Sequence, residues 1–481
     1  MSIPGLGHIP DDTPVTTNRI IKLSPFWEWR FEIGFTSQVT VKLVNGTAEK
    51  DGTELAQKQP YRFTGLKSKI FTWTGCELEI DGVCLDEFVE EYAAAVDTPM
   101  NAYMNLHYKL TSLRANARRE GAKGPRIMIV GPPNSGKTTL VRTLTAYATR
   151  CEEQPLVVNL DPKDSMLSVP GTLSCSVFAG VMDIESPDGW GSSPSSGSSV
   201  VPVKVPAVFY YGHSQPDQDP ATYRSLVSNM AGMVTTRLSE DSDVRGAGLL
   251  IDTPGVNGQD RAGIDCLAHI AEEFSVNIIV VLDSSQRLYS ELSKRFKNTT
   301  SSLGDSITTI LLDKSSGVAE RNESWVSQSH QAAIKHYFFG DSNQTLSPFT
   351  QQVDVSGLTL FQIPERKPQA PSPKPQSFDD CFDRTHSNQR LLDTYVTTGH
   401  SPLVPTQLTT ALEQWTLTIM NASSRDLPEA IRVSTVKGFV YVAQVDSDRG
   451  KAKILAPVAG QLGDHPMIWG KWPEPNVNLL G

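Results

Sequence analysis

The segment RIMIVGPPNSGKTTLVRTL, residues 126–144, restricts the possible folds of this chain more than any other part of it. Gly131, Gly136, Lys137 and Thr138 match the phosphate-loop pattern G-x-x-x-x-G-K-[ST]. The apolar run at 127–130 is typical of a buried parallel strand. Because this motif requires a strand before the loop and a helix after it, the segment predicts an α/β domain built around a parallel sheet.

The residues after the loop supply the expected helix. Leu140, Leu144 and Tyr147 recur at a spacing that places them on one helical face. In such a loop, consecutive backbone N–H groups and the helix N-terminus face a phosphate. The Lys137 ammonium is expected to reach the β- and γ-phosphates, and the Thr138 hydroxyl to ligate Mg²⁺. The alternative is a glycine-rich turn that binds nothing.

Strand and helix patterns alternate from residue 126 to about 340. The predicted strands are 127–130, 156–160, 207–211, 247–252, 278–282 and 307–312. The apolar residues of 222–238 repeat near a period of 3.6 and predict a helix. This alternation predicts a doubly wound α/β sheet, in which ligands bind at the carboxyl ends of the strands.

β domains are expected on both sides of this P-loop NTPase-like sheet. QVTVKLVNG, YRFTG and CELEIDG alternate apolar with polar residues near the N-terminus, and QWTLTIM, IRVSTVKGFVYVAQVD and KAKILAPV do so near the C-terminus. We therefore expect domains at 1–100, 101–345 and 346–481. The Ser- and Gly-rich segment 189–199 is predicted to be a flexible insertion, and the Pro-rich segment 364–377 to be disordered.

Composition excludes several classes of protein. The formal net charge of −10 argues against a protein whose main task is to grip a nucleic-acid backbone. The basic stretch 114–126 is interpreted as a solvated helix end, with an RNA contact as the alternative. The cysteines form no C-x-x-C pair, which disfavours zinc and favours a reducing compartment. No signal peptide is recognised, and the longest apolar run, 278–282, is too short for a bilayer, so no membrane association is expected.

Carboxylates follow two of the predicted strands. Asp161, in NLDPKD, can enter the Mg²⁺ shell, accept a proton from an attacking hydroxyl, or cap a helix. Asp252, in IDTPG, resembles the switch aspartate of GTPases, which supports Mg²⁺. However, no Asn-Lys-x-Asp motif for reading guanine follows, and LLDKSSG has the wrong order. Guanine specificity is therefore unsupported, and a GTPase is the less favoured alternative.

Beyond the phosphate loop, the order of several segments resembles the polynucleotide 5′-hydroxyl-kinase family. The segments are SPFWEWRFEIGF, GTAEKDGTEL, GPPNSGKTTL, NLDPKDSMLSVPGTL, IDTPG, VVLDSSQRLYSEL and SGVAERN…HYFFG. The resemblance covers nearly the whole chain. It is strongest to the branch that contains a subunit of fungal cleavage factor IA, which acts in mRNA 3′-end formation.

The resemblance implies a set of ligand contacts. Glu28 and Lys67 match the residues with which the N-terminal β domain of the family contacts the nucleotide base. Without the resemblance, these two residues would be interpreted as a surface pair. Residues of the phosphate loop are implied to hold the ATP phosphates, namely Asn134, Ser135, Gly136, Lys137, Thr138 and Thr139. Thr138 and Asp161 are the expected Mg²⁺ residues.

Features needed for phosphoryl transfer are incomplete in this chain. Active members of the family resemble D-x-x-Q after the P-loop and carry an arginine-rich lid. Here Asp161 is kept, but the Gln position is Asp164. Arg321 remains, while Ser327–Ala333 contains no arginine. Transfer needs cations over the moving phosphoryl group, so the sequence predicts ATP binding without kinase activity. The alternative, an active RNA 5′-hydroxyl kinase, stays open.

The resemblance also implies a setting in the cell. We expect a nuclear subunit of the cleavage and polyadenylation machinery, with ATP in a structural role. Its expected partners are the large scaffold subunit of the cleavage factor, bound through the central domain, and other 3′-end processing subunits. Because the net charge is −10, contact with pre-mRNA is expected to be mainly indirect.

Overall fold

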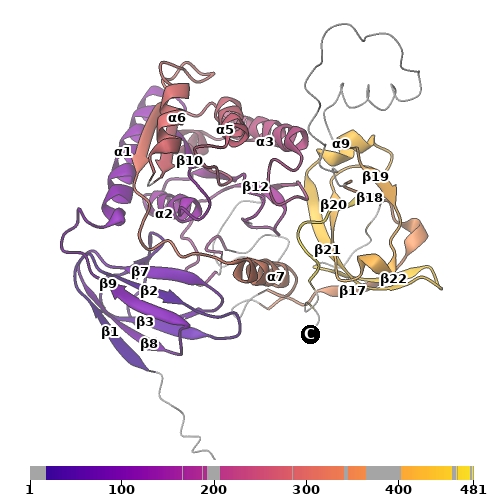
Figure 1. Ribbon diagram of the computed structural model, residues 1–481, viewed down its shortest axis with the longest axis horizontal. Coiled ribbons are helices and arrows are strands. Elements are labelled where there is room, and N and C mark those ends of the chain that lie inside the picture. Colours follow the sequence, from indigo (N-terminus) through magenta and orange to yellow (C-terminus); the bar gives the residue numbers. More distant parts are fainter. Residues whose placement is uncertain are drawn as a thin grey trace, which may run out of the picture. The chain divides into compact units, whose positions relative to one another are not determined.

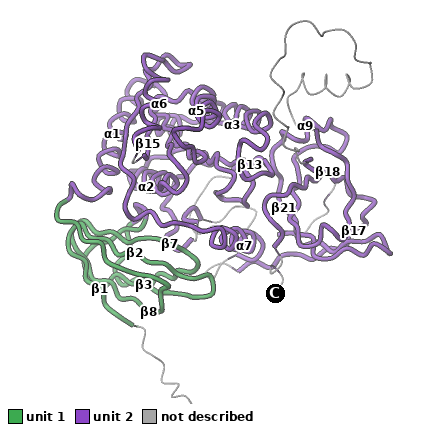
Figure 2. Tube along the Cα trace, in the orientation of Figure 1, with its two compact units in different colours: residues 1–50, 54–94 green, residues 51–53, 95–481 purple. Residues whose placement is uncertain are grey.

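The computed structural model describes residues 18–164, 166–186, 188–191, 206–283, 285–340, 345–364, 402–457, 462, 464–476 and 479. By its internal contacts the chain divides into two compact units (Figure 2). Unit 1 comprises residues 1–50 and 54–94, and unit 2 comprises residues 51–53 and 95–481. Of the two irregular segments predicted from sequence, residues 192–199 and 365–377 lie outside the described residues.

Unit 1 is built from β-strands, as the sequence predicts. One sheet has the order β1 (Arg19–Leu23), β8 (Cys76–Asp81), β3 (Val39–Gly46), β6 (Pro60–Phe63). The other has the order β5 (Thr53–Glu54), β4 (Glu49–Lys50), β7 (Lys67–Phe71), β2 (Glu28–Glu32), β9 (Asp86–Glu90). The Trp29 and Phe31 rings of β2 stack 4.2 Å apart, and Phe31 lies 5.9 Å from Phe63 of β6. These aromatic rings therefore join the two sheets into a sandwich.

The central sheet of unit 2 confirms the doubly wound α/β prediction (Figure 1). Its order is β13 (Ala207–Tyr210), β12 (Thr172–Val177), β11 (Leu156–Asn159), β14 (Leu249–Asp252), β10 (Arg126–Val130), β15 (Ile278–Leu282), β16 (Thr308–Leu312). β11, β14, β10, β15 and β16 run parallel, whereas β12 is antiparallel to both of its neighbours. The sequence patterns did not predict β12.

The ends of the helices in this part of unit 2 are set by local chemistry. These helices are α1 (Pro99–Glu120), α2 (Lys137–Arg150), α3 (Pro220–Glu240), α4 (Ser242–Ala247), α5 (Arg261–Glu273), α6 (Arg287–Arg295) and α7 (Glu323–Phe339). α3 begins where the Asp219 carboxylate accepts the Thr222 N–H, with Pro220 in the first turn. Among the described residues, no helix combines the length and the apolar character needed to cross a membrane.

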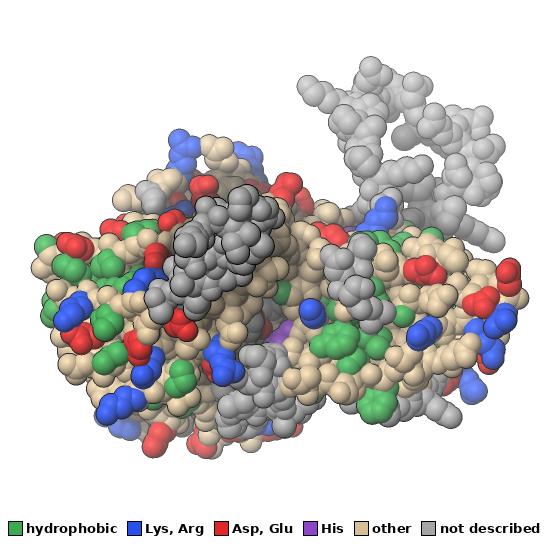
Figure 3. Space-filling view, turned by 90° about the horizontal axis from the view of Figure 1, so that it is seen from below, with side chains coloured by type: hydrophobic (Ala, Val, Ile, Leu, Met, Phe, Trp, Pro, Cys, Tyr) green, Lys and Arg blue, Asp and Glu red, His purple; other side chains and the backbone are tan. Residues whose placement is uncertain are grey.

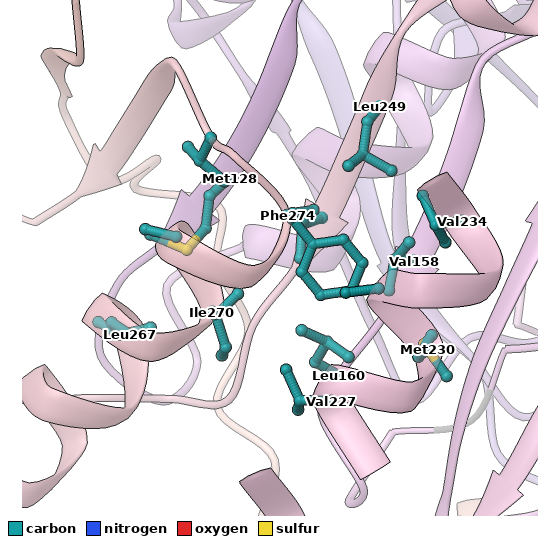
Figure 4. Close-up of a cluster of buried hydrophobic side chains, with 14 of the residues drawn as sticks. Met128, Val158, Leu160, Val227, Met230, Val234, Leu249, Leu267, Ile270 and Phe274 are labelled. Atoms are coloured by element: carbon teal, nitrogen blue, oxygen red, sulfur yellow. The ribbon is translucent and has the colours of Figure 1, made fainter. Parts of the chain in front are cut away.

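The main core lies where α3 and α5 cover one face of the sheet. Met128 and Val158 from the strands meet Val227 and Met230 of α3 and Ile270 of α5 (Figure 4). All five side chains are fully buried. Burial of this kind contributes about 1.5–3 kcal/mol for each large apolar side chain, so the core holds the strand ends of the sheet in fixed positions.

The C-terminal part of unit 2 contains a second sheet. Its order is β17 (Phe349–Asp354), β22 (Lys451–Ala456), β21 (Val436–Asp446), β20 (Thr416–Met420), β23 (Met467–Trp469), β18 (Leu360–Gln362), β19 (Val404–Thr406). Short 3₁₀ turns occur at Val355–Gly357 and Thr410–Leu412.

The segment IRVST, expected as strand, begins instead within the short helix α9 (Pro428–Arg432). Pro428 favours the start of a helix, and the buried Arg432 guanidinium donates to the Tyr210 and Tyr211 carbonyl oxygens at 2.7 and 2.8 Å. Thr435 also forms a β-bridge with Phe209 of β13. The two sheets of unit 2 are thus joined along the β13 edge.

Candidate nucleotide-binding site

The loop between β10 and α2 has a backbone that only particular residues can adopt. Asn134 and Gly136 have φ values of 53° and 89°, in the left-handed region. A Cβ atom on Gly131 would lie 2.6 Å from the Leu282 carbonyl oxygen, so the loop passes too close to β15 for any side chain. In a loop of this conformation, the backbone N–H groups and the N-terminus of α2 can face a phosphate.

The first residues of α2 carry the side chains that the sequence assigned to phosphate and metal. The Lys137 ammonium bends back and donates to the Pro132 carbonyl oxygen at 3.2 Å, across the loop. The Thr138 hydroxyl donates to Asp252 Oδ2 at 2.6 Å. Ser135 is buried, and its hydroxyl has no hydrogen-bond partner in the described part of the chain. Thr139 Oγ1 lies 3.5 Å from the Arg142 guanidinium.

Asp252 is the residue that the sequence likens to the switch aspartate of GTPases. It ends β14, which lies beside β10, so its carboxylate reaches Thr138 although the two residues are 114 positions apart. Its second oxygen, Oδ1, is buried without a hydrogen-bond partner among the described residues. The sequence signal for this residue is the IDTPG segment at a strand end, which resembles the GTPase switch. The geometry places Asp252 beside the P-loop Thr138, although the chain has no guanine-reading motif.

Asp161 lies in a tight turn after β11. Its Oδ1 accepts the Lys163 N–H at 3.0 Å, and the Asn159 side chain holds the Asp161 N–H and the Asp164 carbonyl oxygen at 3.0 and 2.7 Å. Residues 161–164 form no helix, so the helix-cap interpretation of Asp161 is wrong. The carboxylate instead closes an Asx turn on its own backbone.

The electrostatics of the site favour a bound cation. Burial raises the pKa of the Asp161 carboxyl, and the nearby charge of Asp164 raises this pKa further. Burial also raises the pKa of Asp252 to about 6, although Lys137 and the Thr138 hydroxyl partly oppose the rise. Carboxylates whose charge is disfavoured by burial regain it when a metal ion neutralises them.

The oxygen ligands present fit Mg²⁺ in its usual partial coordination. Thr138, Asp161 and Asp252 offer oxygen atoms, and the unpaired Asp252 Oδ1 lacks a partner that a metal-bound water would supply. Among the described residues, no three His, Cys, Asp or Glu side chains are grouped closely enough to hold a metal by themselves. Mg²⁺ would therefore need nucleotide phosphates and water to complete its six ligands.

The two residues expected to contact the base lie in unit 1. Glu28, on β2, is fully buried and pairs with Arg30 at 2.6 Å and with Lys69 at 2.6 Å. Lys67, on β7, pairs with Glu32 at 2.8 Å and is largely buried. The interpretation of Glu28 as half of a surface pair is therefore wrong, because its carboxylate has no exposure. A role in base binding stays a prediction.

The segment expected to be a lid forms α7, and its inward side chain is a histidine. Ser327–Ala333 spans the middle of this helix, and His330 is the buried residue within it. His330 Nε2 lies 3.1 Å from the Lys163 carbonyl oxygen, in the turn that carries Asp161. Arg321 precedes the helix and is exposed. Where active kinases have arginines for the phosphoryl group, this helix therefore contacts the backbone of the site.

Three family profiles cover almost the whole described chain. Residues 131–340 match the profile described as the mRNA cleavage and polyadenylation factor CLP1 P-loop. Residues 22–117 match the N-terminal beta-sandwich domain of polyadenylation factor, and residues 346–474 match the pre-mRNA cleavage complex II protein Clp1. Relatives named mRNA cleavage and polyadenylation factor CLP1 occur in Pyricularia oryzae, at 44% identity, and in Botryotinia fuckeliana, at 42%. Both alignments cover 100% of each chain.

Solved structures agree with these matches. Clp1p in complex with a segment of Pcf11p superposes with a TM-score of 0.79 at 26% identity, covering 95% of this chain and 99% of that one. A second structure, which concerns an extended Pcf11p–Clp1p interface and the basis for ATP loss in a point mutant, also gives a TM-score of 0.79 at 26% identity. It covers 95% of this chain and 98% of that chain.

Proposed function

The chain belongs to the CLP1 family of mRNA cleavage and polyadenylation factors, and on this premise we propose that it is an ATP-binding subunit of the nuclear machinery that cleaves and polyadenylates pre-mRNA. The observation that supports ATP binding most strongly is the P-loop, where Lys137 spans the loop and the Thr138 hydroxyl meets Asp252 at 2.6 Å. Thr138, Asp252 and Asp161 would hold Mg²⁺ against the phosphates, whose charge the ion would neutralise. Asn134–Thr139 would hold the phosphates, and Glu28 and Lys67 the base.

ATP in this protein has a structural role and is not a phosphoryl donor. Within α7 there is no arginine, and its buried polar residue, His330, already contacts the Lys163 carbonyl oxygen. Asp164 places a second carboxylate near Asp161, where a transferring phosphoryl group would need positive charge. An Arg clamp on that group can contribute on the order of 10³–10⁵ in rate, so its loss removes most of the transfer activity.

Direct measurement of phosphoryl transfer separates this proposal from the active-kinase alternative. The purified chain is incubated with γ-labelled ATP and an oligoribonucleotide that has a 5′-hydroxyl end. We expect transfer no faster than that of Lys137→Ala, the background variant. Asp164→Gln should not restore activity, because the cationic lid would still be missing. Wild-type transfer well above the background variant would establish the alternative, an RNA 5′-hydroxyl kinase.

The nucleotide content of the purified protein tests the structural role of ATP. A site that binds ATP without transferring its phosphate has no route by which the γ-phosphate is lost. We therefore expect acid extracts of the protein to contain ATP and Mg²⁺ in near-equal amounts. Anion-exchange chromatography of the extract, with metal analysis, measures both. Mostly ADP, or no nucleotide, would count against this role.

A partner is expected because a family member of known structure is complexed with a segment of Pcf11p. We propose that this chain docks onto the large scaffold subunit of its cleavage factor through the central domain, 101–345, and that other processing subunits join that complex. On the face seen in Figure 3, basic and acidic side chains are interspersed, in keeping with a net charge of −10. Tight RNA binding by the isolated chain that resists salt would contradict mainly indirect contact with pre-mRNA.

A further inference from the structure

Residues Trp472–Asn476, which follow β23, pass over the turn that carries Asp161. We call this segment the C-terminal strap. The Trp472 indole N–H donates to the Pro162 carbonyl oxygen at 3.4 Å, and the Trp472 carbonyl oxygen accepts the Tyr210 hydroxyl at 2.9 Å. Tyr210 is buried at the end of β13. The strap is therefore fixed on one side to the central sheet and on the other to the metal-site turn.

Gly171 allows the strap to pack closely against the turn. Gly171 donates its N–H to the Pro162 carbonyl oxygen at 2.8 Å and has a φ of 88°. A Cβ atom there would lie 3.0 Å from the Trp472 carbonyl oxygen and 3.1 Å from its ring. A glycine at this position lets the Trp472 backbone and ring reach the turn.

Helix α7 contacts both the turn and the strap through His330. The His330 and Trp472 rings meet edge to face, with centroids 4.9 Å apart. His330 Nε2 lies 3.1 Å from the Lys163 carbonyl oxygen, and Nδ1 lies 3.4 Å from Glu474 Oε2. The imidazole thus connects the turn, the helix and the strap.

The far end of the strap is also held. The Asn476 amide donates to the Gln331 carbonyl oxygen of α7 at 3.2 Å. Its own carbonyl oxygen accepts the Tyr441 hydroxyl of β21 at 2.8 Å, and Asn476 is almost fully buried. Trp472 thus holds the turn at Pro162, and His330, which lies beside Glu474 of the strap, holds it at Lys163. Pro162 and Lys163 are the two residues that follow Asp161.

We propose that the C-terminal strap and His330 position the Asp161 carboxylate for the Mg²⁺ that accompanies bound ATP, so that the C-terminal sheet sets the metal dependence of nucleotide binding. Trp472 and His330 touch backbone atoms of the turn and act through them. They are positioning residues, comparable to the outer-shell groups that orient metal ligands elsewhere. This inference rests on the proposed binding of ATP with Mg²⁺.

The test compares ATP affinity with and without the metal. Full-length protein is stripped of nucleotide, and the ATP dissociation constant is measured by calorimetry in MgCl₂ and in EDTA. The ratio of the two constants gives the gain due to Mg²⁺. For His330→Ala we expect this ratio to fall by about 10-fold, the lower end for outer-shell groups, with affinity in EDTA nearly unchanged. His330→Gln, which can still donate to the Lys163 carbonyl oxygen, should retain most of the gain.

Conservative variants cover the case in which His330→Ala does not fold. Trp472→Phe keeps an aromatic ring and removes only the indole N–H donor, so it should reduce the same ratio to a smaller extent. The matched control is Trp415→Phe, since Trp415 packs on Trp469 in the same sheet, and it should leave the ratio unchanged.

The possible outcomes separate this inference from the proposed function. If every strap variant keeps the wild-type ratio, or loses affinity equally in MgCl₂ and EDTA, the strap does not position the metal site. If the wild-type protein binds no ATP in either buffer, the proposed function itself is wrong.

Discussion

Replacing Asp252 by asparagine should have opposite effects on the empty and the loaded protein. The Asp252 carboxylate is almost fully buried, and one of its oxygens has no hydrogen-bond partner among the described residues. Asparagine keeps an oxygen that can accept the Thr138 hydroxyl, now at 2.6 Å from Asp252. The substitution therefore removes the charge and leaves the shape of the site intact.

The size of the effect follows from the pKa of Asp252, which burial raises from 3.8 to about 6. Since each pKa unit corresponds to about 1.4 kcal/mol, the buried charge destabilises the empty folded protein by about 3 kcal/mol above pH 6. The pKa is higher in the folded state, so the stabilisation from proton binding is complete below about pH 4 and is lost as pH rises through about 6. An unpaired amide N–H₂ in the variant costs about 1–3 kcal/mol at any pH.

The unfolding free energy of Asp252→Asn, relative to that of wild type, should therefore increase as pH rises. For nucleotide-free protein, the difference should be about 1–2 kcal/mol larger at pH 8 than at pH 5, where about half of the charge effect remains. With ATP and MgCl₂ the order should reverse, because the variant lacks a charge that supports the metal. Urea denaturation at both pH values, with and without ligand, measures these differences.

The control is Asp265→Asn, which removes the same charge from an exposed pair with Arg295 at 2.7 Å. Exposed pairs contribute about 0–1 kcal/mol, so little change is expected at either pH. If the nucleotide-free Asp252→Asn protein loses more stability at pH 8 than at pH 5, the assignment of a destabilising buried charge is refuted. If ATP and MgCl₂ stabilise it as much as wild type, its role beside the metal is refuted.

Three further predictions concern other parts of unit 2. Lys137→Ala should abolish the rise in melting temperature that ATP produces, which at 1,000 times the dissociation constant represents about 4 kcal/mol. An equal rise in both proteins would refute the role of Lys137 in holding the phosphates. Arg432→Met should leave two carbonyl oxygens without donors and lower stability by about 2–5 kcal/mol in thermal denaturation. The control Arg449→Met, on an exposed turn, should have no measurable effect, and equal effects would contradict the assigned bonds. Burial alone would raise the Glu474 pKa, but the interaction with His330 holds this pKa below its usual value. The stability that Glu474 contributes is therefore present at neutral pH and is lost as pH falls through the folded pKa. The melting temperatures of wild type and Glu474→Gln should converge toward pH 4, and a constant gap would disprove the linkage.

The elements found from sequence are those whose determinants lie close together in the chain. The P-loop occupies a single strand–loop–helix segment, and its glycines are required by the local backbone geometry. β15 is apolar throughout and β10 is apolar after Arg126, and both strands are buried along their whole length, which gives them a clear pattern. In α2 the face formed by Leu140, Leu144 and Tyr147 is buried, as the period predicts.

The strands that the sequence patterns missed owe their burial to their neighbours. β12, TLSCSV, alternates apolar with small polar residues as a half-buried strand would, yet it is buried at every position because it has neighbours on both sides. β2, EWRFE, reads as charged, but Glu28 is accommodated inside unit 1 because Arg30 and Lys69 pair with it. Such strands become visible only when the partner charges and strands are known.

The sequence by itself predicted a phosphate-binding loop, an α/β class and β-strands toward both ends of the chain. Only the tertiary structure decided which distant residues complete the site. The strand order β11-β14-β10 brings Asp252 to Thr138 across 114 positions, and the C-terminal strap brings Trp472 to Pro162 across 310. A local pattern reports the conformation of its own segment. Contacts between segments depend on the order in which strands pair, and that order is set by burial of the whole core.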